Sequence, residues 1–214
     1  MAENTRIILS QSAWKSGVSV LGHADPVLRA IIQRYPNERM HTHPNALKTL
    51  LRAIIGQQIS IAAASAIWRA IESQAGPITP ANLQPMAYAK WRDYGLSDAK
   101  AKTVARVLAY TDGRADTYFH QTPYATIESE LLAIKGIGPW TVAMFQIFHL
   151  GHSNVLPLTD LGLLNAVRTE YQLANHTHAD VRTWLQAHAT RWEPYCTLAV
   201  WYLWRSIDPH VVVY

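Results

Sequence analysis

The sequence predicts an all-α protein, and three observations support that fold class. Apolar residues recur at every third or fourth position through most of the 214 residues, as they do along one face of a helix. Residues that favour helix starts precede these segments, and glycine often stands where they stop. The apolar fraction of 49% provides a core and excludes a disordered chain. We expect roughly ten helices joined by short turns, and only residues 211–214 are typical of a strand.

The N-terminal half supplies three of the expected helices. We expect an added helix within residues 6–17. Residues 45–56 carry an apolar stripe at helical spacing, and the stripe ends at a glycine. Residues 60–73 begin with Ser60, whose hydroxyl suits an N-cap, and turn Trp68 toward the core.

The C-terminal half continues the helical pattern. Residues 98–113 begin with Asp98, a candidate N-cap, and stop at Gly113. Two later helices are expected to begin at Pro139 and Pro194, because proline is favoured at the first helical position.

Composition and charge narrow the class of protein. The formal net charge is +4, and the single cysteine, Cys196, excludes an internal disulfide, a Cys-based zinc site and an iron–sulfur cluster. No apolar run approaches the roughly 18 residues that span a bilayer, and the first residues lack the pattern of a signal peptide. We therefore expect an intracellular protein with no membrane partner, in the cytoplasm or nucleoid of a bacterium or the nucleus of a eukaryote.

A short glycine-containing turn is the most informative local pattern. Lys135, Gly136, Ile137 and Gly138 separate one apolar helix from the next, which begins at Pro139. Glycines let the backbone turn sharply and approach a ligand, and the N–H groups at the start of a helix suit a phosphate. Taken alone, the turn is more typical of a packed corner between two helices.

Four segments in a fixed order resemble one known family: residues 53–60, 94–102, 131–167 and 192–205. The resemblance is to the helix-hairpin-helix superfamily of DNA base-excision glycosylases, in particular the alkylpurine enzymes of the 3-methyladenine DNA glycosylase II type, over about residues 24–207. It implies a single glycosylase domain over residues 1–214, in which two helical subdomains flank a cleft, without an N-terminal β-domain. One subdomain, roughly residues 40–150, carries a wedge loop and the hairpin, and the N-terminal and C-terminal helices build the other.

Asp160 opens the helix that follows the hairpin segment. An aspartate there is ordinarily an N-cap worth about 1 kcal/mol, whereas the matching aspartate of the family is the catalytic carboxylate. Cleavage of an N-glycosidic bond builds positive charge on the sugar, and a fixed anion stabilises that charge and can activate water. The family commonly has Asp-Asp at these two positions, and the second aspartate carries the catalysis. This chain has Thr159 followed by Asp160, so the catalytic aspartate is kept. Both roles can hold together, because a cap fixes the carboxylate.

Trp140 separates two types of family member. Bifunctional members carry a lysine there, whose amine forms a Schiff base with the sugar, so the resemblance implies a monofunctional enzyme without lyase activity. Trp140 and Trp204 match base-pocket walls of the family, and Met144 is expected to be the third wall. An aromatic face attracts a cation, and N3- or N7-alkylated purines are cationic. Tryptophan is more often a core residue, and we expect that role for Trp68, Trp184 and Trp192.

Further DNA contacts follow from the same resemblance. Gln58 lies in the loop where family members place a wedge that fills the gap left by an extruded nucleotide, although an ordinary exposed loop glutamine fits the sequence as well. The hairpin and Thr141 are expected at the DNA backbone. The main-chain carbonyls that match a monovalent-cation site, for sodium or potassium, belong to Leu132, Ile134 and Ile137. Other candidate phosphate contacts are Arg69, Lys100, Lys102, Arg106 and Lys135.

The resemblance implies a monomeric enzyme of base-excision repair that needs no cofactor. Its substrate is double-stranded DNA with damaged bases of the 3-methyladenine and 7-methylguanine type. Three alternatives remain open: a glycosylase for another lesion, such as an adenine or uracil mispair; a non-catalytic helix-hairpin-helix module that binds DNA; and a helical protein for an apolar ligand.

Overall fold

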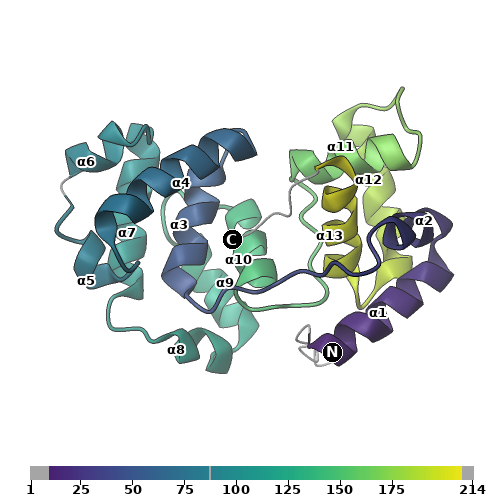
Figure 1. Ribbon diagram of the computed structural model, residues 1–214, viewed down its shortest axis with the longest axis horizontal. Helices are drawn as coiled ribbons and strands as arrows, with labels where there is room; N and C mark the ends of the chain where they lie inside the picture. The colour runs from purple at the N-terminus through teal and green to yellow at the C-terminus, as the bar shows by residue number, and fades with distance from the viewer. Residues whose placement is uncertain (1–9, 87, 209–214) are drawn as a thin grey trace. The chain divides into compact units, whose positions relative to one another are not determined.

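The computed structural model describes residues 10–86 and 88–208. That part of the chain contains thirteen α-helices, one 3-10 helix and no β-strand (Figure 1). The all-α prediction is therefore confirmed. The helices outnumber the expected ten because several have only four to six residues, which is too short for a periodic apolar stripe. The segment expected to be a strand, residues 211–214, lies outside the described residues.

The chain folds into two compact units. We call residues 43–150 the hairpin unit, and residues 10–42 together with 151–208 the terminal unit. The hairpin unit contains α3 (Ala46–Gly56), α4 (Ile61–Ala75), α5 (Pro80–Leu83), α6 (Tyr88–Asp93), α7 (Asp98–Thr111), α8 (Asp116–Gln121), α9 (Tyr124–Leu132) and α10 (Pro139–Phe148). The terminal unit contains α1 (Gln11–Ala24), α2 (Pro26–Arg34), α11 (Leu161–Glu170), α12 (His178–His188), the 3-10 helix η1 (Ala189–Trp192) and α13 (Cys196–Ile207).

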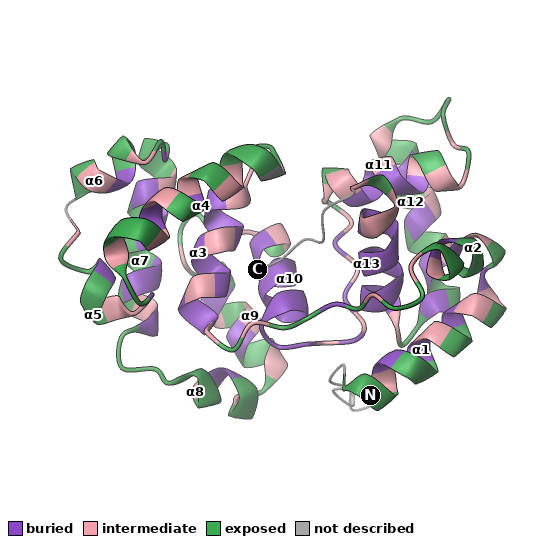
Figure 2. Ribbon diagram, in the orientation of Figure 1, coloured by how far each residue is buried: buried purple, intermediate pink, exposed green. Residues whose placement is uncertain are grey.

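The hairpin unit is built around α3 and α10. Every residue of α10 from position 141 to position 148 is buried (Figure 2). A helix that is covered on all sides needs neighbours on all sides, and α3 packs against α10, α7 and α4. The same core contains Trp68, as the sequence predicts, and Trp91.

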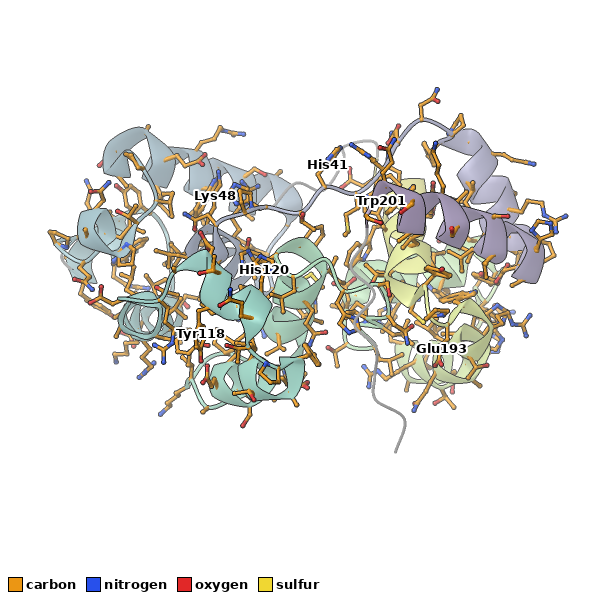
Figure 3. The ribbon with its side chains drawn as sticks, turned by 90° about the horizontal axis from the view of Figure 1, so that it is seen from below. His41, Lys48, Tyr118, His120, Glu193 and Trp201 are labelled. Atoms are coloured by element: carbon orange, nitrogen blue, oxygen red, sulfur yellow. The ribbon has the colours of Figure 1, made fainter. Side chains whose placement is uncertain are left out.

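The short helix α8 is attached to this core through its tyrosine. Tyr118 donates its hydroxyl hydrogen bond to both carboxylate oxygens of Glu130 on α9, at 2.8 and 2.9 Å, and Tyr110 of α7 donates to the same carboxylate at 2.7 Å. Tyr118 and His120 both lie on α8 (Figure 3). One carboxylate thus joins the three helices α7, α8 and α9.

The terminal unit is centred on α13, which is buried from Cys196 to Trp204 and packs against α11 and α2. Trp201 (Figure 3) meets Trp14 of α1 edge to face, with ring centroids 5.3 Å apart. Burial raises the pKa of the Cys196 thiol to about 12, so the thiol is protonated and unreactive at neutral pH.

Asp25 joins four elements of the terminal unit. It is 1% exposed and caps α2, where its Oδ1 accepts two amides of the first turn. Its Oδ2 accepts from the Tyr171 hydroxyl at 2.7 Å and from His188 Nε2 and Trp192 Nε1, each at 2.9 Å. Burial raises the pKa of this carboxyl, but the hydrogen bonds from His188, Trp192 and Tyr171 outweigh it and hold the pKa below its usual value. Trp192 is buried as expected, and Trp184 is half-buried against His188.

Two of the expected helix starts are wrong by one or two residues, and one expected helix ends later than predicted. The helix expected within residues 6–17 begins at Gln11, after the Ser10 cap, and continues to Ala24. The N-cap of α7 is Ser97, whose hydroxyl accepts the Lys100 amide, so that Asp98 is the first helical residue. Pro194 precedes α13 by two residues, because the backbone of Tyr195 is non-helical and its amide closes a turn onto the Trp192 carbonyl.

Among residues 10–86 and 88–208, none of the helices is both long and apolar enough to cross a bilayer.

We expect Asp25→Asn to lower the free energy of unfolding near neutral pH by about 2 kcal/mol, because a buried carboxylate with three side-chain donors loses its charge. A lowered folded pKa stabilises the protein above the unfolded pKa of about 4, and this stabilisation is lost as pH falls through the folded value. The variant is therefore predicted to lose less stability on acidification. Urea unfolding from about pH 7 to about pH 3 measures both effects. Equal stability near pH 7 would contradict the first, and parallel pH profiles of the two proteins would contradict the second.

Candidate functional site

Asp160 caps α11 and is held there by two donors. Its Oδ1 accepts the Leu163 amide at 2.5 Å and the indole Nε1–H of Trp204 at 2.8 Å. The first contact is the N-cap hydrogen bond of an α-helix, and the second comes from α13, 44 residues further along the chain. The capping role is thus confirmed. The carboxylate has one fixed orientation at the positive end of a helix dipole.

Two features around Asp160 were not predicted from the sequence. A Cβ at Gly162 would lie 3.1 Å from Asp160 Oδ1 and 3.7 Å from Trp204 Nε1, so the glycine keeps room for the hydrogen bond between them. Leu161, the first residue of α11, is 59% exposed. A glycine in the first turn of a helix was a signal in the sequence, since glycine is unfavourable inside helices.

Gly136 shapes the hairpin. Its φ is +102°, a conformation that favours glycine. A Cβ there would lie 1.9 Å from Thr103 Oγ1 on α7, so two independent constraints require glycine. Ile137 is 6% exposed, whereas Lys135 is exposed. Gly138, in extended conformation, precedes the first turn of α10, whose N–H groups lack intrahelical partners.

The side chains of α10 that were predicted to contact DNA or the base are more buried than expected. Thr141 is 1% exposed, and its hydroxyl accepts a hydrogen bond from Gln57 Nε2 at 2.8 Å. Its side chain is therefore not at the surface, where a contact with the DNA backbone would require it. Trp140 is half-buried, near the last turn of α3, where a Cβ at Gly56 would lie 3.9 Å from its Cη2. Met144 is 1% exposed.

Gln58 lies in the short link between α3 and α4. Its side chain is exposed, and its φ of +57° is left-handed. Ile59, the next residue, is 38% exposed. We call residues 57–60 the wedge loop. Exposure fits both the wedge and the ordinary loop residue, and the unusual φ indicates a loop that its surroundings hold in place.

Three of the candidate phosphate contacts are committed to partners in the protein. Lys100 donates to the carbonyls of Ile55 and Gln57 at 2.7 and 2.6 Å. Arg106 donates to the carbonyl of Lys135 at 3.2 Å, and Lys102 pairs with Asp98 at 2.8 Å, one helical turn away. Positive charge in the sequence did not distinguish a phosphate ligand from a side chain that caps a helix end.

Three main-chain carbonyls of the hairpin segment, those of Leu132, Ile134 and Ile137, were predicted to bind a monovalent cation. Ile134 O accepts the Ile137 amide at 2.9 Å, and the carbonyls of Leu132 and Ile137 accept no hydrogen bond from the described residues. Main-chain carbonyls are neutral oxygen ligands, the kind that hard cations take. Elsewhere in the described chain, no group of three or more His, Cys, Asp or Glu side chains could hold a metal ion.

The predicted residues fall into two sets. Asp160 and Trp204 lie in the terminal unit and are in contact. The other predicted residues lie in the hairpin unit, where the wedge loop, the hairpin and the first turn of α10 meet through Gln57 and the face of α7.

Comparison with known proteins decides the family. No family model matches the chain. A DNA-3-methyladenine glycosidase of known crystal structure from Bacillus halodurans is 32% identical, covers 89% of this chain and 88% of its own, and superposes with a TM-score of 0.71. The chain belongs to the DNA-3-methyladenine glycosylase family. The resemblance of the four segments to this family of helix-hairpin-helix proteins is therefore confirmed.

A structural and a sequence comparison with fission yeast extend the family likeness. The 3-methyladenine DNA glycosylase of Schizosaccharomyces pombe, solved with abasic DNA, is 25% identical, with coverage of 89% of this chain and 96% of that chain, and a TM-score of 0.80. DNA-3-methyladenine glycosylase 1 of the same organism is 29% identical over 199 residues, 90% of this chain and 81% of that protein. The family likeness thus spans both units.

Gly136→Ala is expected to destabilise the protein more than Gly113→Ala. Both glycines have positive φ, +102° and +72°, where a Cβ costs about 1 to 2 kcal/mol. The space around Gly113 is open, whereas alanine at position 136 must also displace Thr103. Urea unfolding of the two variants beside wild type measures the difference, and equal losses would show that the contact with α7 does not constrain the hairpin.

Proposed function

We propose that this protein is a monofunctional DNA glycosylase that removes alkylated purines from double-stranded DNA by hydrolysing the N-glycosidic bond. The observation that carries the proposal is the Asp160 carboxylate, held by Leu163 N–H and Trp204 Nε1–H in a chain of the DNA-3-methyladenine glycosylase family. We propose that the protein acts as a monomer in the compartment that contains the DNA, which is the nucleoid of a bacterium or the nucleus of a eukaryote.

Asp160 is the proposed catalytic carboxylate. As the base departs, the sugar gains positive charge, and an anion already held in place stabilises that charge without first having to reorganise. The same carboxylate can orient and deprotonate the attacking water. Its Oδ1 is committed to Leu163 and Trp204, so the orientation of the carboxylate is set before the substrate arrives.

Trp204 and Trp140 are the residues proposed to recognise the cationic base, and each is argued from the contacts within its own unit. Trp204 is 8% exposed, and its N–H on Asp160 fixes the orientation of the indole ring. Trp140 is half-buried in the first turn of α10, where the bifunctional relatives have lysine. An aromatic face attracts a cation by about 1 kcal/mol or more. We retain Met144 as a proposed pocket residue, buried one turn further along α10.

The hairpin is the proposed grip on the DNA backbone. The N–H groups at the start of α10, after Gly138, suit a phosphate. A sodium or potassium ion held by the carbonyls of Leu132, Ile134 and Ile137 would add positive charge beside that phosphate. The net charge of only +4 favours such main-chain contacts over a broad basic surface. Gln58 is the proposed wedge that fills the gap left by the extruded nucleotide.

We expect Asp160→Asn to lower the single-turnover rate of base release by about 100-fold or more. Asparagine caps a helix about as well as aspartate, so the fold is kept. Release of free base is measured from duplexes that carry 3-methyladenine, 7-methylguanine or a deaminated base, with binding to abasic DNA as the control for folding. An unchanged rate would remove Asp160 from the mechanism. No release of alkylated purine by wild-type protein that binds DNA would instead favour a non-catalytic module or another lesion.

Trp204→Phe is predicted to lower kcat by about tenfold with little change in KM, because it removes the N–H that orients Asp160 and keeps an aromatic face. Trp14→Phe is the matched control, since Trp14 is also 8% exposed in the terminal unit and does not contact Asp160. A change confined to KM would mean that Trp204 contributes only to binding the base.

A further inference from the structure

The wedge loop is held in a backbone conformation that it would not adopt freely. The φ of Gln58 is +57°, which costs a residue other than glycine about 1 to 2 kcal/mol. Such a conformation persists where the surrounding structure fixes it. The side chains of Lys100 and Gln57 supply contacts that do so.

Lys100 binds the main chain on the N-terminal side of Gln58. From the first turn of α7, its ammonium donates to the carbonyls of Ile55, at 2.7 Å, and Gln57, at 2.6 Å. Because α3 ends at Gly56, the Ile55 carbonyl is among those that a helix end leaves without an intrahelical partner. A cation there also opposes the negative end of the helix dipole. The Gln57 carbonyl belongs to the peptide group that enters Gln58, so the ammonium fixes the orientation of that peptide.

Gln57 connects the wedge loop to the hairpin. Its Nε2 donates to Thr141 Oγ1 at 2.8 Å and to the Gly136 carbonyl at 3.3 Å. The first acceptor lies at the start of α10 and the second in the turn before it. Main chain and side chain of one residue thus link Lys100 to the proposed phosphate grip.

One face of α7 holds both segments. Lys100, Thr103 and Arg106 are spaced three residues apart and therefore lie on the same side of the helix. Lys100 holds the wedge loop, while Arg106 Nη1 donates to the Lys135 carbonyl at 3.2 Å. Thr103 Oγ1, which donates to the Ala99 carbonyl at 2.9 Å, lies 3.3 Å from the same Lys135 carbonyl. Burial lowers the pKa of the Lys100 ammonium, which accords with a group withdrawn from solvent.

We propose that Lys100 is a positioning residue that holds the wedge loop and the hairpin together as one preformed DNA-binding edge. The proposal rests on the proposed function, in which Gln58 enters the duplex. A loop that is already ordered loses less conformational freedom when it inserts than a mobile loop does. Lys100 therefore assists extrusion of the nucleotide and takes no part in cleavage of the glycosidic bond.

The test compares one lesion in two settings. Single-turnover release of 7-methylguanine is measured from a fully paired duplex and from the same strand with the lesion opposite a mismatched base, which costs less to extrude. Lys100→Met is expected to slow release from the paired duplex by about tenfold or more, and from the mismatched duplex by less than about threefold. Lys100→Arg, which can donate to the same carbonyls, is expected to recover most of the loss.

Lys90→Met is the matched control, because Lys90 lies over the Tyr94 ring in the same unit and touches neither loop. Its rates are expected to equal those of wild type. Equal losses for Lys100→Met on the two duplexes would overturn the proposal. The slope of the logarithm of DNA affinity against the logarithm of salt concentration is also compared for Lys100→Met and wild type. A slope reduced in the variant by about one phosphate contact would mean that Lys100 is a phosphate ligand, and would also overturn the proposal.

Amide hydrogen exchange separates failure of this proposal from failure of the proposed function. In the free protein, Lys100→Met is expected to raise exchange in residues 57–60 and 135–138 above the level in Lys90→Met. If wild type releases no base, the proposed function fails. Unchanged exchange in residues 57–60 and 135–138 of Lys100→Met would overturn the positioning role of Lys100, whatever the activity of the protein. If Lys100→Met does not fold, Gln57→Ala takes its place. We expect this variant to raise amide exchange in residues 135–138, and unchanged exchange there would overturn the proposal.

Discussion

The hydrogen bond from the Trp204 indole to the Asp160 carboxylate is the contact on which the proposed chemistry depends. It joins a residue that caps α11 to a residue buried in α13, so two helices that pack against each other in the terminal unit also orient the carboxylate. Gly162 leaves room for the contact. Electrostatic stabilisation is most effective when charged groups are already oriented. The carboxylate is fixed by the cap and by the indole, both of which belong to the folded unit itself.

The chain separates two physical tasks between its units. The terminal unit holds the proposed catalytic carboxylate at the start of α11, in contact with the buried helix α13, and the hairpin unit holds the segments proposed to bind DNA. In the hairpin unit, backbone groups left without partners at helix ends serve two purposes. Lys100 satisfies carbonyls at the end of α3, while the amides at the start of α10 suit a phosphate.

Local sequence patterns predicted the features of the structure that neighbouring residues determine, such as helices and their caps. The helical period predicted the fold class, a serine hydroxyl predicted the Ser60 cap, and a glycine predicted the end of α3. Asp160 was predicted both as a cap and as a family position. Contacts between distant segments could not be predicted, because no local pattern encodes them. Lys100 lies 45 residues from Ile55, and its charge alone suggested a phosphate ligand. Trp204 was expected as an aromatic wall, and its role as a donor to Asp160 became visible only in three dimensions.

A double-mutant cycle on Asp160 and Trp204 tests the central claim most directly. Single-turnover base release is measured for wild type, Asp160→Asn, Trp204→Phe and the double variant. If the indole acts by orienting the carboxylate, the double variant releases base no more slowly than Asp160→Asn alone. If the two losses multiply, Trp204 acts independently of Asp160, and the claim that their hydrogen bond prepares the site is contradicted.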